Sequence, residues 1–112
     1  MSIKFPKEIK IGYATFKVKH TSRKSIESAG AFGDTQFNES IINIYGNQAD
    51  EEAVNTTLHE LLHSINYIFS IKHKNAREEE RYVRHMANAL TTVFRDNPNL
   101  LLWIKKNLKD KK

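Results

Sequence analysis

Two histidines and a glutamate stand at a spacing that suits metal chemistry. The segment His59-Glu60-Leu61-Leu62-His63 has the pattern His-Glu-x-x-His. On an α-helix, residues four positions apart lie about 40° apart around the axis, so both imidazoles can reach one cation from the same side. Glu60 lies at the edge of that face, where its carboxylate can take a proton from a water that the cation polarises. The motif therefore predicts two zinc ligands, His59 and His63, and one general base, Glu60.

A catalytic zinc site needs a third protein ligand and keeps its fourth position open. The downstream candidates are His73, His85, Glu78, Glu79 and Glu80. The helical period of this region points His85 and Glu78 away from the apolar face and leaves Glu79 and Glu80 on or beside it. Periodicity alone slightly favours Glu79. The alternative for all three glutamates is that they are first-turn acids that complement the helix dipole.

The apolar periodicity predicts a long helix that carries the motif, from about Ala49 to Ser70. Its expected buried face consists of Val54, Leu58, Leu61, Leu62, Ile65 and Phe69. Acidic residues at 50–52 fall in its first turn, where they complement the helix dipole. His59 and His63 lie well away from the centre of the apolar face, so they are not core histidines. Two surface histidines on a solvated face are the alternative to a metal site.

Two further helices follow in the pattern. The second should end near Asp96 and bury a face made of Val83, Met86, Ala87, Leu90 and Phe94. Asn97 and Pro98 have the form of a cap and a first-turn proline, which predicts a short third helix. We expect residues 100–102 and Trp103 to pack this helix onto the core, and an oligomer interface is the alternative.

The first half of the chain has the alternation of strands. Ile9, Ile11 and Tyr13, followed by Phe16 and Val18, predict a hairpin-like pair of strands with a break near Gly12. Ile41–Tyr45 predicts another strand, whereas Thr21–Ala29 is ambiguous. Strands followed by helices predict an α+β chain. We expect one domain over residues 1–112, strand-rich over 1–47 and helical over 48–112.

Composition limits the class of protein. A chain of 112 residues suffices for one small core, and the lack of cysteine excludes disulfide frameworks and thiolate zinc clusters. Apolar runs are too short for a membrane span or an export signal, so we expect a soluble, cytoplasmic protein without a membrane partner. The net charge of +5 comes from basic ends around an acidic middle. Solvated termini explain this pattern, and nucleic acid is the alternative partner. The basic residues concerned are Lys4, Lys7, Lys10, Lys17, Lys19 and the C-terminal lysines.

The motif, with an acid opening a second helix, resembles the zincin metallopeptidases, in particular their gluzincin branch. In the ImmA/IrrE-like members the second helix reads Glu-x-x-Ala-Asn-x-Phe-Ala-x-x-Leu-Leu, and the leading glutamate is the third ligand. Placing Glu80 there puts Val83, Met86 and Leu90 on apolar positions. The resemblance therefore implies Glu80, in preference to Glu79, as the third ligand. Arg84 departs from the family, which has Asn or Asp at this position.

The layout of the whole chain is also similar to small proteins of phages and prophages. The matching pieces are Gly33, Ile42, Ile44, Thr56, the histidine motif, Glu80, residues 86–90 and residues 96–98. The resemblance implies a zinc-dependent metallopeptidase that hydrolyses a peptide or protein substrate inside a bacterial cell, with Zn²⁺ as cofactor and Glu60 as general base. The alternatives are a non-catalytic zinc-binding protein and a basic nucleic-acid-binding accessory protein.

The resemblance also implies how a substrate would be held. In zincins the strand before the metal helix commonly forms the edge of the cleft, and residues 40–45 would have that role here, pairing with an extended peptide. An oxyanion donor is also required. Tyr67, Tyr82, Arg84 and His85 are conceivable donors, but surface or packing roles explain each of them, and none is assigned.

Overall fold

The computed structural model describes residues 5–21 and 32–109. In this part of the chain, strands precede helices, so the α+β class predicted from the sequence is confirmed. The strands are β1 (Glu8–Ile11), β2 (Ala14–Thr21), β3 (Gly33–Gln36) and β4 (Ile41–Tyr45). The helices are α1 (Asp50–Ile68), α2 (Ala76–Asp96) and α3 (Pro98–Asn107). None of these helices combines the length and apolar character that crossing a membrane requires. Most of the ambiguous segment Thr21–Ala29 lies outside the described residues.

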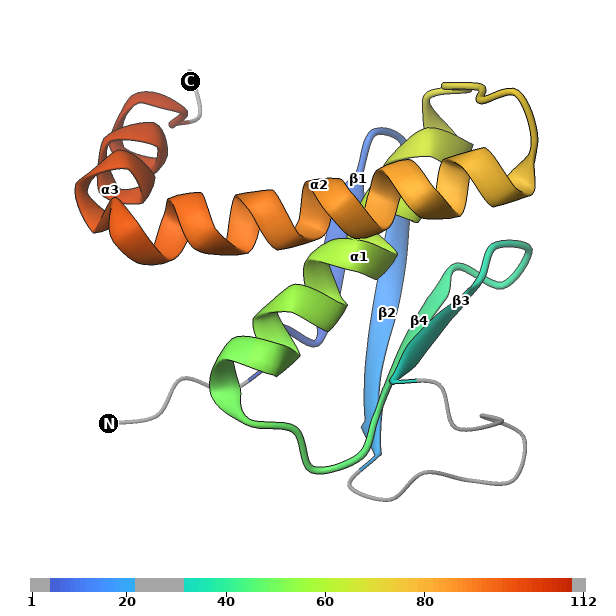
Figure 1. Ribbon diagram of the computed structural model, residues 1–112, viewed down its shortest axis with the longest axis horizontal. Helices are drawn as coiled ribbons and strands as arrows, with labels where there is room; N and C mark the ends of the chain where they lie inside the picture. The colour runs from blue at the N-terminus through green and yellow to red at the C-terminus, as the bar shows by residue number, and fades with distance from the viewer. Residues whose placement is uncertain (1–4, 22–31, 110–112) are drawn as a thin grey trace.

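The strands form one mixed sheet in the order β1-β2-β4-β3 (Figure 1). β1 and β2 make the predicted antiparallel hairpin, and its turn contains Gly12 with a positive φ of 60°. β4 runs parallel to β2 on one side and antiparallel to β3 on the other. β4 is therefore an inner strand, and β3 forms the edge of the described sheet.

The expectation that residues 40–45 form the cleft edge is wrong. β4 is paired along both sides, with β2 and with β3, and its Ile42 and Ile44 side chains are fully buried. The edge position belongs to β3, Gly33–Gln36, which the sequence pattern did not predict as a strand. This segment lacks alternating apolar residues, so its extended conformation depends on pairing with β4.

The helices stack on one face of the sheet in two layers. α1 lies against the sheet, and α2 crosses α1 on the side away from the strands (Figure 1). The core cluster consists of Ile11, Phe16, Ile42 and Ile44, and Leu61, Ile65 and Ile68 of α1 pack against it. On α2 the buried residues are Val83, Ala87 and Thr91. α1 is thus enclosed from two sides.

This enclosure changes which side of α1 is buried. Val54 and Phe69, expected in the apolar face, are 47% and 58% exposed, whereas Glu60 and Ser64 are buried. The prediction assumed a helix with one buried side and one solvated side. Because α1 lies between the sheet and α2, polar residues beside the apolar stripe are also buried. The helix itself is slightly shorter than predicted, starting at Asp50 and ending at Ile68.

The later helices have the predicted bounds but not all of the predicted packing. α2 ends at Asp96 and buries Val83 and Ala87, as its periodicity indicated. α3 begins at Pro98, but the Asn97 side chain donates to the Val93 carbonyl (2.9 Å) and does not cap α3. The expectation that Trp103 packs α3 onto the core is wrong, because Trp103 is 63% exposed. α3 turns away at the end of α2, beyond the reach of the sheet (Figure 1).

Gly33 allows β3 to lie close against α1. A Cβ atom at this position would lie 2.8 Å from Thr56 Cγ2, 3.0 Å from the Asn43 carbonyl oxygen and 3.3 Å from Glu60 Cγ. The first two distances are too short for ordinary contacts, and one of the two atoms belongs to the backbone. β3 must therefore carry glycine here to keep its present position.

We expect Gly33→Ala to destabilise the protein by about 1–3 kcal/mol, the usual cost of overpacking. The added methyl group would push β3 away from α1. Chemical denaturation followed by circular dichroism measures the change. Gln36→Ala, at an exposed position of the same strand, is the matched control and should stay within about 0.5 kcal/mol of wild type. Equal stability of Gly33→Ala and wild type would contradict the packing described.

Candidate metal centre

α1 presents the two motif histidines towards α2. His59 and His63 are one helical turn apart, and their ring centroids are 5.0 Å from each other. Their side chains are only 19% and 17% exposed, respectively. The interpretation of two histidines on a freely solvated helix face does not fit this burial. Both rings lie at the contact between the two helices.

The start of α2 brings a carboxylate to both rings. Glu80 Oε1 lies 3.1 Å from His59 Nε2 and 2.9 Å from His63 Nε2. The three donor atoms all lie within 4.8 Å of one another. The Asn75 side chain caps α2 by accepting a hydrogen bond from the Glu78 backbone N–H (2.9 Å) and so defines where this helix begins. Two segments separated in sequence thus converge at one point.

The donor set fits a divalent cation of the zinc type. Zinc binds imidazole nitrogen and carboxylate oxygen at about 2.0–2.2 Å, which separates neighbouring ligand atoms in a tetrahedron by about 3.3–3.6 Å. The two distances from Glu80 are a few tenths of an ångström shorter, because here the carboxylate hydrogen-bonds directly to the imidazoles. All three donor atoms lie within 4.8 Å of one another, so side-chain adjustments alone can bring them to this spacing.

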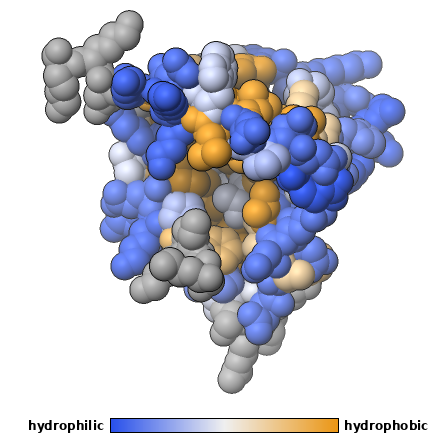
Figure 2. All heavy atoms as spheres, turned by 90° about the vertical axis from the view of Figure 1, so that its left-hand side faces the viewer, coloured by the Kyte–Doolittle hydropathy of each residue, from blue (hydrophilic) through white to orange (hydrophobic). Residues whose placement is uncertain are grey.

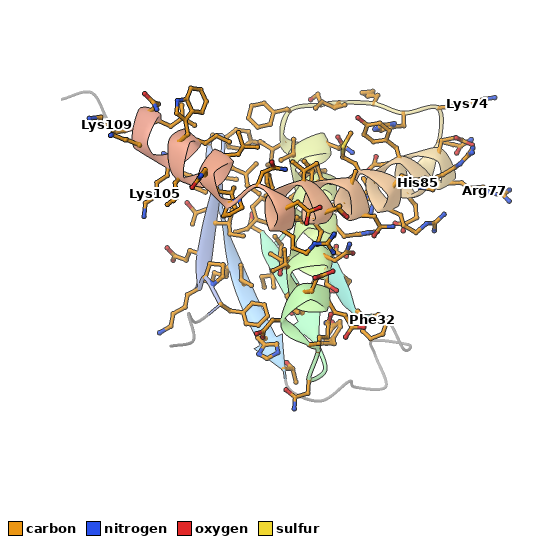
Figure 3. All side chains as sticks on the ribbon, turned by 60° about the vertical axis from the view of Figure 1, so that its left-hand side comes forward. Phe32, Lys74, Arg77, His85, Lys105 and Lys109 are labelled. Atoms are coloured by element: carbon orange, nitrogen blue, oxygen red, sulfur yellow. The ribbon has the colours of Figure 1, made fainter. Side chains whose placement is uncertain are left out.

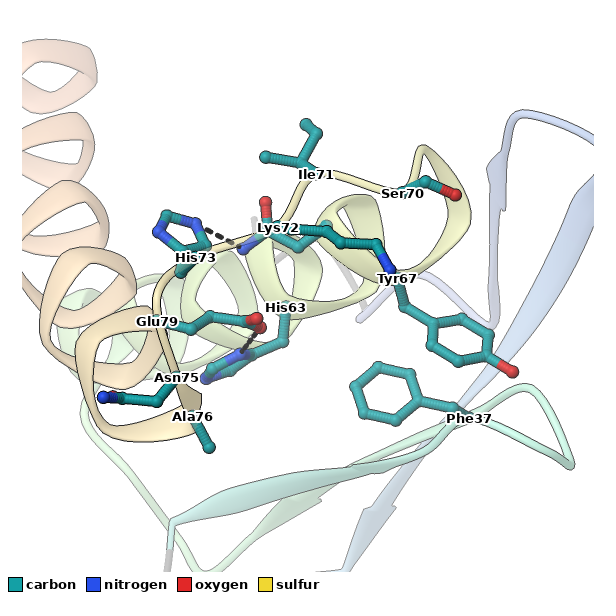
Figure 4. Close-up of a pocket in the computed structure, with 11 residues that line it drawn as sticks. Phe37, His63, Tyr67, Ser70, Ile71, Lys72, His73, Asn75, Ala76 and Glu79 are labelled. Carbon is teal, nitrogen blue, oxygen red and sulfur yellow. Dashed lines mark hydrogen bonds and ion pairs between the residues drawn. The ribbon is translucent and has the colours of Figure 1, made fainter.

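Glu79 contacts the opposite nitrogen of His63. Its Oε2 lies 2.8 Å from His63 Nδ1, as the dashed line in Figure 4 shows. A carboxylate on the outer nitrogen fixes the tautomer and orientation of a ligand imidazole and increases its basicity. Glu79 and Glu80 therefore have different contacts. Glu80 contacts the Nε2 atoms of both histidines, whereas Glu79 contacts Nδ1 of His63 on the opposite side of the ring. Glu79 can thus supply an orienting contact to His63, whereas Arg84, which replaces the Asn or Asp of the family, is exposed.

The charges in this cluster depend on one another. Burial lowers the pKa of His63, but hydrogen bonds to Glu79 and Glu80 outweigh it, so the pKa lies above its ordinary value. Burial raises the pKa of Glu80, but hydrogen bonds and charge interactions with His63 and His59 outweigh it, so the pKa lies below its ordinary value. Without metal, the hydrogen bonds to the two carboxylates therefore favour the protonated form of the His63 imidazole. A bound cation would take the place of the proton on Nε2.

Glu60 is buried beside the histidines and faces β3. It is 7% exposed, and the Thr35 hydroxyl donates a hydrogen bond to its Oε1 at 2.7 Å. Burial raises the pKa of Glu60 above its ordinary value, although the Thr35 hydrogen bond and the nearby histidines act in the opposite direction. A carboxylate with a raised pKa binds a proton more strongly than a solvated one, as a general base requires.

The other sequence candidates lie apart from this cluster. His73 is beside Asn66 (3.5 Å) and its ring lies 5.1 Å from that of Tyr82. His85 and Glu78 are exposed, and Figure 3 shows His85 pointing away from the core. Tyr67 stacks on Phe37 with the ring centroids 4.6 Å apart. The structure brings none of these side chains to the three donor atoms, and no oxyanion donor is assigned.

A cleft opens between β3 and the start of α2. A pocket of about 580 Å³ is lined by residues of β3, by Glu60 and His63 of α1, and by Glu79 and Glu80 of α2. A second pocket of about 470 Å³ shares His63 and Glu79 with it and extends along Phe37 and Tyr67 (Figure 4). The two pockets therefore form one continuous groove past His63.

Two contacts were outside the sequence prediction. Thr35 was not identified, because no local pattern marked β3 as a strand, and its side-chain direction follows only from the pairing of Thr35 with Ile42. Glu79 was considered as a competing metal ligand or as a first-turn acid of the helix. Its position next to Glu80 was the available signal, since adjacent helical residues point in different directions and can approach different atoms of one ring.

Comparison of the chain with protein-family models, with curated proteins and with solved structures gave no match.

We expect Glu79→Gln to weaken zinc binding by about 10–100-fold, the usual effect of losing a carboxylate behind a ligand histidine. Competition with a chromophoric chelator at pH 7 measures the affinity. Glu78→Gln is the matched control, because Glu78 is exposed and pairs only with Arg81 (3.9 Å) among the described residues. Equal affinities for the two variants would show that Glu79 does not support His63.

The metal-free protein should lose stability as the pH rises. Folding raises the pKa values of both Glu60 and His63, so the folded state binds protons more tightly than the unfolded state. The resulting stabilisation is complete below the ordinary values of 4.5 for Glu60 and 6.5 for His63. It is lost as the pH rises through each raised value. The lowered pKa of Glu80 acts only under more acidic conditions, where stability falls as this carboxylate is protonated.

Glu60→Gln should therefore raise the melting temperature of the metal-free protein at pH 8 by several degrees, since about 1 kcal/mol corresponds to about 4–8 °C in a small domain. The difference from wild type should disappear below pH 4.5, where Glu60 is protonated. Thermal unfolding in a chelator between pH 4 and 9 tests this. A difference that is independent of pH would contradict the role of the Glu60 charge.

Proposed function

We propose that this chain is a zinc-dependent peptidase with His59, His63 and Glu80 as metal ligands and Glu60 as general base. The observation that carries the proposal is the convergence of three donor atoms within 4.8 Å beside a buried carboxylate. Two neutral imidazoles and one carboxylate are the ligand set of hydrolytic zinc sites, and they leave a coordination position open. A structural site would normally close that position with a fourth protein ligand.

The bound cation would supply positive charge that polarises the scissile carbonyl and makes a nearby water more acidic. The Glu60 carboxylate would then accept and transfer the proton of that water. Thr35 occupies Oε1 of Glu60, so the other oxygen is left to accept the proton of the attacking water. The same carboxyl group can pass that proton to the departing amine. The raised pKa of Glu60 favours both steps, because it brings the carboxylate closer to the basicity that water activation needs.

The edge strand β3 supports an extended peptide as substrate. It borders the groove opposite α2, and within the described part of the chain its outer edge has no partner strand. A peptide that paired with β3 would pass between Thr35 and the start of α2, directly beside Glu60 and the donor atoms. Phe37 and Tyr67 line the neighbouring pocket, which suits an apolar side chain of the substrate.

A non-catalytic zinc protein and a basic nucleic-acid-binding protein are the alternatives. Lys7, Lys10, Lys17 and Lys19 are exposed on or beside the hairpin, and Lys4 lies outside the described residues. Glu8 lies opposite Lys17 in the register, which reduces the positive charge of this surface. We favour the peptidase because neither alternative requires the buried Glu60 carboxylate beside the metal site. A bacterial cytoplasmic location and a phage or prophage origin remain part of this proposal.

Metal analysis and proteolysis of matched variants test the function. Wild type should bind one zinc ion, and His63→Ala and Glu80→Ala should bind none at micromolar zinc. Glu60→Gln should keep the zinc and lose peptidase activity by about 10²–10⁴-fold, the usual contribution of a general base. Activity is measured on a mixed peptide library by mass spectrometry.

The outcomes separate the alternatives. Zinc binding without cleavage in wild type supports the non-catalytic protein, and chelator-resistant retention on DNA that falls steeply with salt supports the nucleic-acid function. Retention of zinc by both ligand variants would remove the basis of the site.

A further inference from the structure

α3 exposes an unusual amount of apolar surface for so small a chain. Leu102 and Trp103 are 64% and 63% exposed, Leu108 is 80% exposed, and α3 contains no buried residue. Single exposed apolar residues are common, but a contiguous group on one helix indicates an interaction surface. We call Leu102 and Trp103 the α3 ridge.

A groove lies beside this helix. Two adjoining pockets of about 330 and 320 Å³ share Asp50 and Val54 at the start of α1. Their apolar walls come from Phe5, Leu58, Phe94 and Leu101. Figure 2 shows this face of the molecule, where hydrophobic atoms gather in the middle and hydrophilic atoms surround them. We call these two pockets together the α1–α3 groove.

The ridge and the groove carry opposite charges at their borders. Lys105 and Lys106 follow the ridge in the last turn of α3, whereas Asp50 and Glu51 line the groove. Glu51 pairs with Arg95 at 3.2 Å. Asp50, Lys105 and Lys106 take part in none of the ion pairs found within residues 5–21 and 32–109. These three charges are therefore available to a partner.

We propose that the α3 ridge of one copy of this chain docks into the α1–α3 groove of a second copy, forming a two-fold symmetric dimer. Both complementary surfaces are on the same chain, so one rotation brings each ridge to the other groove and closes the assembly. Leu102 and Trp103 would fill the apolar groove beside Val54. Lys105 and Lys106 would lie against Asp50 at its border, and this charge match favours a second copy over an unrelated apolar partner.

This dimer leaves the proposed metal centre open. α3 follows the C-terminal end of α2, whereas Glu79 and Glu80 stand in the first turns of that helix. Figure 3 shows the same separation, with Lys105 and Lys109 at one end of the molecule and Lys74 and Arg77 at the other. The inference therefore does not depend on the proposed function, and the circular dichroism spectrum serves as the check of folding.

Sedimentation velocity and tryptophan fluorescence test the dimer on the full chain. The monomer has a mass of 13.0 kDa, and Trp103 is its single tryptophan. We expect the mass to double with rising concentration and the Trp103 emission to shift to shorter wavelength over the same range. A mass of 13.0 kDa at every concentration up to 1 mM, the scale of the weakest specific affinities, would overturn the proposal.

Trp103→Glu should weaken dimerisation by at least about 30-fold, as expected for a central aromatic residue of an interface. Because Trp103 is mostly exposed in the monomer, this variant should keep the circular dichroism spectrum and zinc stoichiometry of wild type. Tyr13→Ser is the matched control, since Tyr13 is 83% exposed in the β1–β2 turn. A Trp103→Glu dimer as tight as that of wild type would place the contact elsewhere and overturn the proposal.

Cysteine cross-linking tests the register of the contact, because the chain has no cysteine of its own. Under mild oxidation, a mixture of Asp50→Cys and Lys106→Cys proteins should form the mixed disulfide faster than either protein links to itself. The reverse order of rates would contradict the docking of α3 at the start of α1.

Discussion

The contact between the Glu80 carboxylate and two imidazoles depends on how α2 crosses α1. Val83 and Ala87, further along the same helix, are fully buried. Their packing fixes the path of α2 and thereby the position of Glu80 relative to His59 and His63. A polar cluster of this kind gains little net energy from its own hydrogen bonds after desolvation. The apolar contact therefore positions the site, and the charges determine what it can bind.

The same arrangement explains why α1 carries buried polar side chains. A helix between a sheet and a second helix has too little exposed surface to keep all of its polar residues in water. Ser64 donates to the Glu60 backbone carbonyl (2.8 Å), and Thr35 donates to the Glu60 side chain. Within the described residues, no buried polar side-chain atom lacks a hydrogen-bond partner. Each buried polar group is thus compensated, which limits its cost to folding.

The molecule separates two kinds of surface along the length of α2. Near its first turns lie titratable groups, a groove and β3, the edge strand of the described sheet. Near its last turns lie apolar side chains of α3 and the beginning of α1. Changes at one end can therefore occur without altering the other. A chain of 112 residues in this way keeps the candidate metal centre and the exposed apolar side chains of α3 at opposite ends of one helix.

The local patterns were sufficient for the helices and the hairpin, because helical and strand periods depend on neighbours along the chain. The His-Glu-x-x-His spacing likewise indicated that two imidazoles share one side of a helix. Which of Glu79 and Glu80 approaches both Nε2 atoms depends on the crossing of α1 and α2, since by periodicity alone either carboxylate could face the first helix. The strand Gly33–Gln36 and the Thr35 contact arise from pairing with β4. The exposure of Trp103 was also decided in three dimensions, because an apolar helix face does not specify whether its own chain or another copy covers it.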